Sequence, residues 1–228
     1  ALSGELVPDA VNVKGGEIHE EIRPTLPLVE KMAQIATGLE AELPVSIEIT
    51  VKGEVSIYDS SILATSALKG ALIAIGTEDA TYVNSPNLAQ EKGMSATVSS
   101  EAECEDYRSM ICLRAAFSNG ARVEVDATLM GIRKVEKIIR INKFDIELPP
   151  SDHLLFLIYE DRPGVVGAVG NILGAAKINI ANMQVARDKA GGEALMALTV
   201  DSAIPIEFTE KIAKEVGARV SRSVSLLV

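Results

Sequence analysis

Residues 159–187 read YEDRPGVVGAVGNILGAAKINIANMQVAR, and this stretch decides the fold of the second half of the chain. Pro163 is typical of the start of a helix, which we expect over 165–176, and a strand pattern follows it. The flanking sequence predicts strands at 154–160, 180–188, 193–201 and 218–226, and a second helix at 205–216. The resulting order, βαββαβ, is that of a split βαβ sandwich. Because two helices cover only one face of its sheet, we expect this small unit to find a partner.

The sequence before the double proline at 149–150 predicts a separate unit of strands and helices. Alternating apolar residues indicate strands at 45–51, 96–100, 110–117 and 122–130, followed by a hairpin around Asn142-Lys143. Helices are expected from Pro27, from Asp59 as an N-cap to Ile75, and over 85–93. The predicted fold class is therefore α/β, built as two α+β domains at 26–150 and 151–228, with residues 1–25 as a linker.

Composition excludes some classes of function. The net charge of −10 argues against a nucleic-acid-binding protein, which needs a basic face. Cys104 and Cys112 are the only cysteines and lack CxxC spacing, so we expect reduced thiols in a cytoplasmic protein. No apolar run approaches the roughly 18 residues of a membrane span, so no membrane partner is expected. The chain begins without Met, which predicts that it is a piece of a longer protein.

The glycines of the quoted stretch do not form a nucleotide-binding motif. Gly164, Gly167, Gly170 and Gly174 lack the GxGxxG spacing of a dinucleotide site, in which the ribose-binding acid would sit about 20 residues on, at the end of a second strand. Gly167, Gly170 and Gly174 fall at i, i+3 and i+7 of the predicted helix. We interpret them as one helix face in close contact with the sheet.

The turn EDRPG, residues 160–164, suits a small zwitterion better. The first N–H groups of the following helix have no internal partner and suit a carboxylate, and Asp161 suits an ammonium. Gly164 lets a ligand approach the backbone, and Asn179 can both donate and accept. Together these groups predict an α-amino acid site. The alternative is that Asp161 is only the helix N-cap and Asn179 only a turn residue.

These stretches resemble a known family. DRPGVVGAVGNILGAAKINIANMQVAR is similar to the ACT domain, an amino-acid-sensing regulatory module. GELVPDAVNV, SALKG, YVNSPNLAQEKG and VEKI resemble the C-terminal half of the long, bacterial type of D-3-phosphoglycerate dehydrogenase. In that family an intervening domain joins the dehydrogenase core to the ACT domain. The resemblance covers essentially the whole chain, and it implies that residues 1–25 end the dehydrogenase's substrate-binding region.

The resemblance implies an effector, a cofactor and an assembly. L-serine, the pathway end product, would bind where two ACT domains meet, at Tyr159, Asp161 and Asn179, with Gly164 in the same turn. Some relatives place His where this chain has Tyr159. The parent enzyme would oxidise D-3-phosphoglycerate with NAD and form a homotetramer, with its ACT domains pairing as dimers.

We expect this chain alone to bind no cofactor and to be catalytically inactive. The family's catalytic machinery is a nicotinamide-binding Rossmann domain with an Arg, an acidic residue and a His, and none of it precedes Ala1 here. His19 and His153 are the only histidines, and no nucleophile and acid accompany them. Two alternatives stay open: a stand-alone amino-acid-binding module, and the regulatory part of another amino-acid enzyme such as a serine dehydratase.

A basic cluster lies within residues 1–150, where acidic residues outnumber basic ones. It consists of Arg133, Lys134, Lys137 and Arg140. On a strand, Arg133 and Lys137 would share one face, and Lys134 and Arg140 the other. The resemblance implies an anion pocket here for a phosphorylated substrate acting as an allosteric ligand, and Lys69 in SALKG could join it. The alternative is a solvated strand face that offsets nearby acids.

Overall fold

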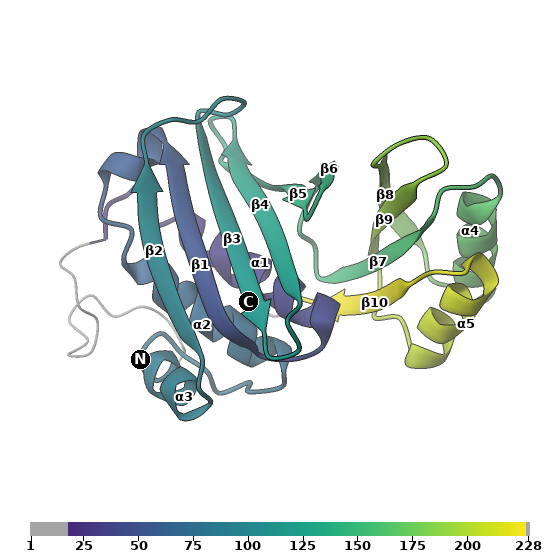
Figure 1. Cartoon of the computed structure of the whole chain (residues 1–228), viewed down its shortest axis with the longest axis horizontal. Coiled ribbons are helices and arrows are strands. Elements are labelled where there is room, and N and C mark those ends of the chain that lie inside the picture. The colour runs from purple at the N-terminus through teal and green to yellow at the C-terminus, as the bar shows by residue number, and fades with distance from the viewer. Residues whose placement is uncertain (1–17, 227–228) are drawn as a thin grey trace. The chain divides into compact units, whose positions relative to one another are not determined.

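The computed structural model describes residues 18–226, which divide between Glu136 and Lys137 into two compact units (Figure 1). The predicted boundary at Pro149–Pro150 lies after a hairpin that packs with the second unit. Residues 1–17 of the predicted linker lie outside the described residues. Of its remaining residues, Ile22 and Thr25 are buried. No helix among residues 18–226 is long and apolar enough to cross a membrane.

The first unit is a sheet covered by helices. Its strands are β1 (Pro44–Gly53), β2 (Ser95–Glu101), β3 (Ser109–Phe117) and β4 (Arg122–Met130), in the order β2-β1-β3-β4. β1 runs parallel to β2 and antiparallel to β3. Its helices are α1 (Thr25–Glu40), α2 (Ile62–Ala74), α3 (Ser85–Glu91) and the short η1 (Glu54–Ile57).

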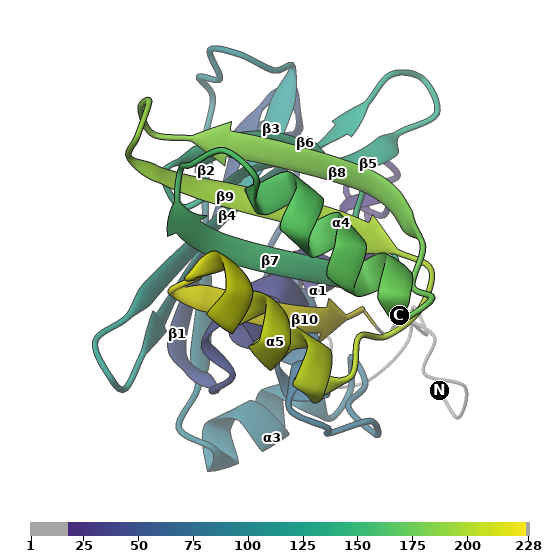
Figure 2. The same cartoon turned by 90° about the vertical axis from the view of Figure 1, so that its right-hand side faces the viewer.

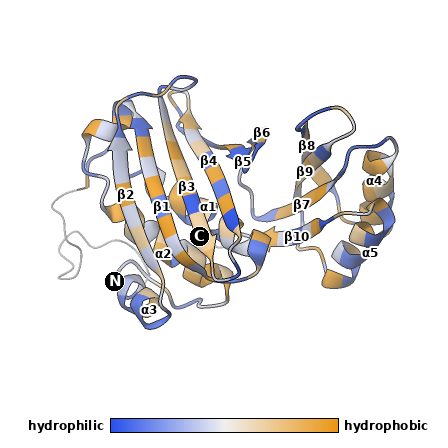
Figure 3. Ribbon diagram, viewed as in Figure 1, coloured by the Kyte–Doolittle hydropathy of each residue, from blue (hydrophilic) through white to orange (hydrophobic). Residues whose placement is uncertain are grey.

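The apolar side chains of β1 pack between this sheet and its helices. Hydrophobic and hydrophilic residues alternate along the strand (Figure 3), and Ile47, Ile49 and Val51 are at most 1% exposed. α1 packs against β3 and β4, and α2 packs against β1 and β2. The predicted strand therefore buries the face that carries its alternating apolar residues. Asp59 is not the N-cap of α2: its carboxylate accepts from the Ser61 backbone, and Ser61 takes the cap position.

Helices α1 and α2 meet at Glu30 and Gly70. A Cβ on Gly70 would lie 2.2 Å from the backbone oxygen of Glu30, so only glycine fits at this crossing. The Glu30 carboxylate is itself buried and binds Lys69 Nζ at 2.7 Å and the Tyr82 hydroxyl. Burial, reinforced by the charge of Glu30, raises the pKa of Tyr82. The SALKG sequence lies within α2, and both its Lys and its Gly contact α1.

The second unit begins with a hairpin and continues as the predicted βαββαβ. The hairpin joins β5 (Val135–Ile141) to β6 (Phe144–Leu148), which lies against β8 and β9. The remaining elements are β7 (His153–Glu160), α4 (Val165–Ala175), β8 (Ile180–Arg187), β9 (Glu193–Val200), α5 (Ile206–Val216) and β10 (Val220–Ser225). The sheet order is β10-β7-β9-β8, and α4 and α5 lie side by side over one face (Figure 2).

The glycine face of α4 corrects a prediction. Gly167 and Gly174 are exposed and Gly170 is half-buried, and a Cβ on any of the three would meet no atom within 4 Å among residues 18–226. Larger side chains make the contact with the sheet instead, namely Val165, Val169, Ile172 and Leu173. The i, i+3, i+7 spacing identified one face of the helix correctly, but that face points away from the sheet.

We expect Gly70→Ala to destabilise the first unit by about 1–3 kcal/mol, because the new methyl group overlaps backbone that cannot move without separating α1 from α2. Urea unfolding of wild type and variant measures this difference. Thr65→Ala, on the same helix, is the control and should change stability by no more than about 0.5 kcal/mol. Equal stability of Gly70→Ala and wild type would show that the crossing relaxes freely.

Candidate functional site

The turn after β7 places Asp161 between a backbone anchor and an arginine. Its N–H donates to the carbonyl of Gly192 at 2.8 Å, and its Oδ2 accepts from Arg187 Nη1 at 3.1 Å. Among the described residues no side chain caps the N-terminus of α4, where Gly164 holds the cap position. The reading of Asp161 as only a helix cap is therefore wrong. Its carboxylate does not cap the helix and instead pairs with the guanidinium of Arg187.

Gly164 fixes the start of α4 by its backbone. Its φ of 93° lies in the left-handed region that glycine adopts without strain. The first hydrogen bond of the helix runs from Ala168 N to Gly164 O at 3.0 Å. The N–H groups before Ala168 are therefore left without partners inside the helix and lie at the end where Asp161 stands.

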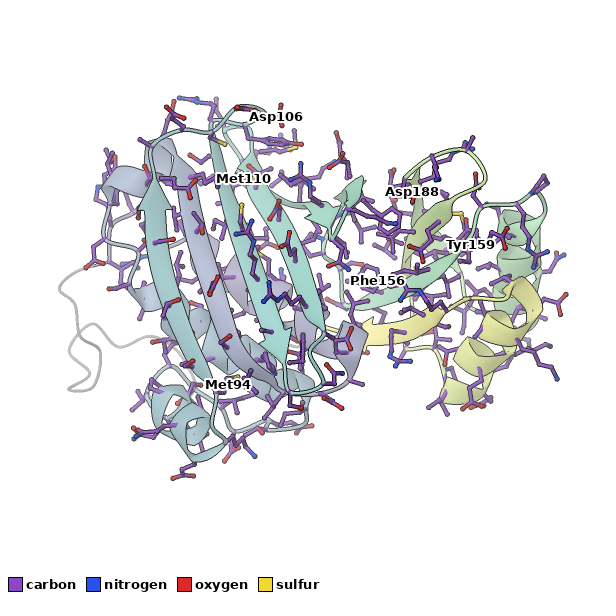
Figure 4. All side chains as sticks on the ribbon, viewed as in Figure 1. Met94, Asp106, Met110, Phe156, Tyr159 and Asp188 are labelled. Carbon is purple, nitrogen blue, oxygen red and sulfur yellow. The ribbon has the colours of Figure 1, made fainter. Side chains whose placement is uncertain are left out.

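Tyr159 forms the apolar floor of the same turn. It is 3% exposed and belongs to the same core cluster as Val165 of α4. Figure 4 labels Tyr159 in the second unit. Burial raises the pKa of its hydroxyl, and the charge of Asp161 adds to this, whereas Arg187 opposes it. The charges of Asp161 and Arg187 therefore both act on the Tyr159 hydroxyl. Tyr159, Asp161 and Gly164 thus lie in and beside one turn, and their role in binding an effector stays a prediction.

Asn179 lies elsewhere in the unit. Its Nδ2 donates to Asp201 Oδ2 at 3.0 Å, and its backbone carbonyl accepts from the Asp201 N–H at 3.2 Å. The first bond holds the side chain, and the second holds the backbone, at the entrance to β8. Asn179 is therefore an exposed amide in a fixed position.

The strand register separates Asn179 from Asp161. Asp161 follows Glu160, which pairs with Glu193 at the start of β9, and Asn179 precedes Ile180, which pairs with Val200 at its end. At about 3.3 Å per residue, the length of β9 between these pairs is roughly 23 Å. An amino acid is far smaller than this, so within one chain Asp161 and Asn179 cannot touch the same ligand.

Sequence reasoning missed Arg187, the last residue of β8. In register it pairs with Ala194, which also pairs with Tyr159 on the other side of β9. Residues directly opposite one another point to the same face, so Arg187 shares the helix-covered face with Tyr159. The sequence signal was a charged residue ending an alternating strand, but its relation to Asp161 requires the strand order.

The predicted anion cluster is dispersed among acidic partners. Arg133 and Lys134 lie in the turn before β5, so the strand faces predicted for these two residues are wrong. The lysines form ion pairs: Lys134 with Glu21 at 2.9 Å, Lys137 with Glu147 at 3.4 Å, and Lys69 with Glu30 at 2.7 Å. The anion site on Arg133, Lys134, Lys137 and Lys69 stays a prediction, and an anion there would compete with these carboxylates.

The first unit also contains a pocket of about 770 Å³. It lies beside η1, the start of β3 and the end of β4, and Asp106 and Met110 in its lining are labelled in Figure 4. Lys134 lines it, paired with Glu21, and Arg108 binds Glu54 at 2.9 Å in the same lining. Its two basic residues are thus paired with acidic residues of the lining, and Asp106 adds a further negative charge.

The two histidines each contact a neighbouring side chain. The His19 ring stacks on Tyr58 at 3.7 Å, and His153 Nδ1 lies 3.1 Å from the Ser225 hydroxyl. Cys104 and Cys112 are both free thiols. Burial, with the charge of Asp126, raises the pKa of Cys112 to about 12, so this thiol is not a nucleophile at neutral pH.

Comparison with known proteins gives two family matches. Residues 21–142 match the D-3-phosphoglycerate dehydrogenase intervening domain, and residues 153–217 match the ACT domain. The chain is 38% identical to D-3-phosphoglycerate dehydrogenase of Mycobacterium leprae over 99% of the chain and 43% of that protein. It is 31% identical to that of Synechocystis over 99% of the chain and 41% of the relative. The chain thus spans about two fifths of the length of the curated relatives it matches.

Lys143, between the two matched regions, forms a charge network with the β8–β9 loop. Its Nζ binds Asp188 Oδ2 at 3.0 Å and Glu193 Oε2 at 2.9 Å, and Glu193 also accepts from Arg219 at 3.1 Å. The hydrogen bonds to Glu193 and Asp188 raise the pKa of Lys143. Lys143 in turn lowers the pKa of both carboxyls. The tip of the β5–β6 hairpin is thereby fastened to the loop that follows Arg187.

We expect Lys143→Met to lower the melting temperature by an amount that depends on pH. Since the folded-state pKa of Glu193 lies below its ordinary 4.5, the contribution of Lys143 is complete above pH 4.5 and is lost as the pH falls through the lowered values. It is lost again as the pH rises above 10.5, because the pKa of Lys143 is raised above that value. Thermal unfolding of both proteins from pH 3 to pH 8 measures the acid limb.

The control is Lys189→Met, which removes a charge from the same loop at a residue whose side chain forms no ion pair within residues 18–226. A difference between Lys143→Met and wild type that stays constant down to pH 3 would contradict the ion-pair network.

Proposed function

The chain belongs to the D-3-phosphoglycerate dehydrogenase intervening-domain family and continues into an ACT domain, and on that premise we propose that it is the regulatory part of a D-3-phosphoglycerate dehydrogenase. The intact enzyme oxidises D-3-phosphoglycerate to 3-phosphohydroxypyruvate with NAD, the first step of L-serine biosynthesis. The relatives named above, which carry this enzyme name, support the assignment. The match to the intervening domain favours it over a stand-alone amino-acid-binding module or the regulatory part of a serine dehydratase.

The regulatory ligand in this proposal is L-serine, bound between the ACT units of two chains. Its ammonium lies on Asp161 and its carboxylate lies at the first N–H groups of α4. Asn179 of the partner subunit closes the site. The observation that carries this arrangement is the separation of roughly 23 Å between the two ends of β9, since it lets Asp161 and Asn179 serve one ligand only across two chains.

Two features of the second unit support a pairing through β8 and α4. β8 is an edge strand, so its outer backbone groups are open to a second strand. In an antiparallel pair of β8 strands, the start of one lies beside the end of the other. This brings the partner subunit's Asn179 toward the turn that holds Asp161. The exposed face of Gly167, Gly170 and Gly174 lets another backbone approach α4 closely.

Regulation follows from linkage between ligand and assembly. A site made by two chains is complete in one arrangement of the paired units and incomplete in others. Serine therefore stabilises that arrangement by the difference in its binding free energy between them. In the intact homotetramer the favoured arrangement biases the catalytic part toward its less active state.

The purified chain should neither bind NADH nor reduce 3-phosphohydroxypyruvate, because the proposal places the dinucleotide fold in the remaining three fifths of the protein. Fluorescence titration with NADH and a coupled absorbance assay test this, with the full-length enzyme as the positive control. Turnover above the buffer blank would contradict the assignment of this chain as regulatory.

Asp161→Ala should weaken serine binding by about ten- to a hundredfold, since a charge-assisted hydrogen bond contributes roughly 1.5–3 kcal/mol. Asn179→Ala should act in the same direction. Isothermal titration calorimetry with L-serine measures both, and thermal unfolding checks that each variant stays folded. An affinity of Asp161→Ala within twofold of wild type would place the serine site elsewhere.

Mixing the two variants tests the shared site directly. A dimer of Asp161→Ala with Asn179→Ala has one site with both residues replaced and one intact site, which combines Asp161 of one chain with Asn179 of the partner subunit. Unfolding and refolding the variants together should therefore restore tight binding at one site in about half of the dimers, those that combine both variants. Mixtures with no recovered affinity, despite mixed dimers by native mass spectrometry, would contradict a site formed across chains.

A further inference from the structure

One ion pair occupies the place where the proposed ligand's ammonium lies. Arg187 Nη1 donates to Asp161 Oδ2 at 3.1 Å, and the two side chains differ in exposure: 61% for Arg187 and 19% for Asp161. Asp161 is also anchored through its backbone to Gly192. The carboxylate is therefore the fixed member of the pair, and the guanidinium reaches it from solvent.

The register shows where Arg187 can act. Tyr159, Ala194 and Arg187 stand opposite one another on β7, β9 and β8, on the face that α4 covers. Ala194, which stands between Tyr159 and Arg187, carries only a methyl group and is fully buried. The guanidinium thus stands over the same end of the sheet as the turn at Asp161 and the first turn of α4.

An α-amino acid supplies the opposite charges to both members of such a pair. Its ammonium can take the place of the guanidinium on Asp161, and its carboxylate can take the place of Asp161 on the guanidinium. Arginine binds carboxylates with two parallel hydrogen bonds, which a single point charge does not reproduce. Opening the pair costs little, because an ion pair with one highly exposed member is weak in water.

We propose that Asp161 and Arg187 of one chain form a split receptor for the zwitterion of an α-amino acid, in which Arg187 binds the ligand's carboxylate together with the first N–H groups of α4 and makes the site select amino acids over simple amines. The inference rests on the proposed function, and adds to it a residue that decides the class of ligand. It explains why a ligand must carry both charges. An amine alone leaves the guanidinium without its partner, and an acid alone leaves Asp161 without one.

The test uses three probes with the folded chain: L-serine, ethanolamine, which lacks the carboxylate, and 3-hydroxypropionate, which lacks the ammonium. Calorimetry compares wild type with Arg187→Gln and Arg187→Lys. Arg162→Gln is the matched control, because it removes the same charge beside Asp161 from a residue that forms no ion pair within residues 18–226.

We expect Arg187→Gln to weaken serine binding at least tenfold and to leave ethanolamine binding unchanged or tighter, so that selectivity for serine over ethanolamine falls. Arg187→Lys should keep part of the selectivity, and Arg162→Gln should keep all of it. Serine binding by Arg187→Gln that equals or exceeds wild type would overturn the inference, since Arg187 would then only obstruct Asp161.

The proposed function fails in a different way. If wild-type protein binds none of the probes, both the serine site and the split receptor are wrong. If wild type binds serine and loses it with Asp161→Ala but not with Arg187→Gln, the serine site stands and only the role of Arg187 is excluded.

Discussion

The antiparallel pairing of β9 with a strand on each side is the constraint on which the proposed site depends. β7 and β8 are both antiparallel to β9, so they run parallel to each other and their C-terminal ends lie at the same end of the sheet. Asp161, which follows β7, and Arg187, which ends β8, both lie at that end. Asn179, which precedes β8, lies at the opposite end of the strands. No local change of a side chain can alter this separation, because it is set by the backbone hydrogen bonds of three strands.

Much of this fold could be predicted from short-range patterns. Alternation and turn residues placed the strands and helices of both units within a few residues of their observed ends, because each pattern reports which side chains are buried. The direction in which a helix face points could not be predicted in the same way. The spacing of Gly167, Gly170 and Gly174 identified a helix face, but whether it met the sheet depended on the competing bulk of Val169 and Leu173. Local sequence does not state which of two faces packs inward when both are uncharged.

The part of the site that could not be predicted depends on contacts between strands that are distant in sequence. Asp161 and Asn179 were found because each stands at the end of a regular element, where polar groups are left for a ligand. Arg187 meets Asp161 only because β9 is inserted between their strands, and that order is a property of the whole sheet. The predicted basic cluster depends on contacts of the same kind: Lys134 and Lys137, close in sequence, pair with acidic residues from different segments, and their use as an anion site stays a prediction.

The proposed role of Arg187 places the ligand one residue from a second charge network. Arg187 binds Asp161, and the next residue, Asp188, binds Lys143 at the tip of the β5–β6 hairpin. A ligand that draws Arg187 away from Asp161 therefore acts on a backbone whose neighbouring side chain is fastened to that hairpin. Since a ligand shifts an equilibrium only by its difference in affinity between two states, the coupling requires that the site be complete in one state alone. A site shared between two chains, as proposed, meets that requirement through its geometry, and the ion pair of Asp188 with Lys143 lies one residue from Arg187.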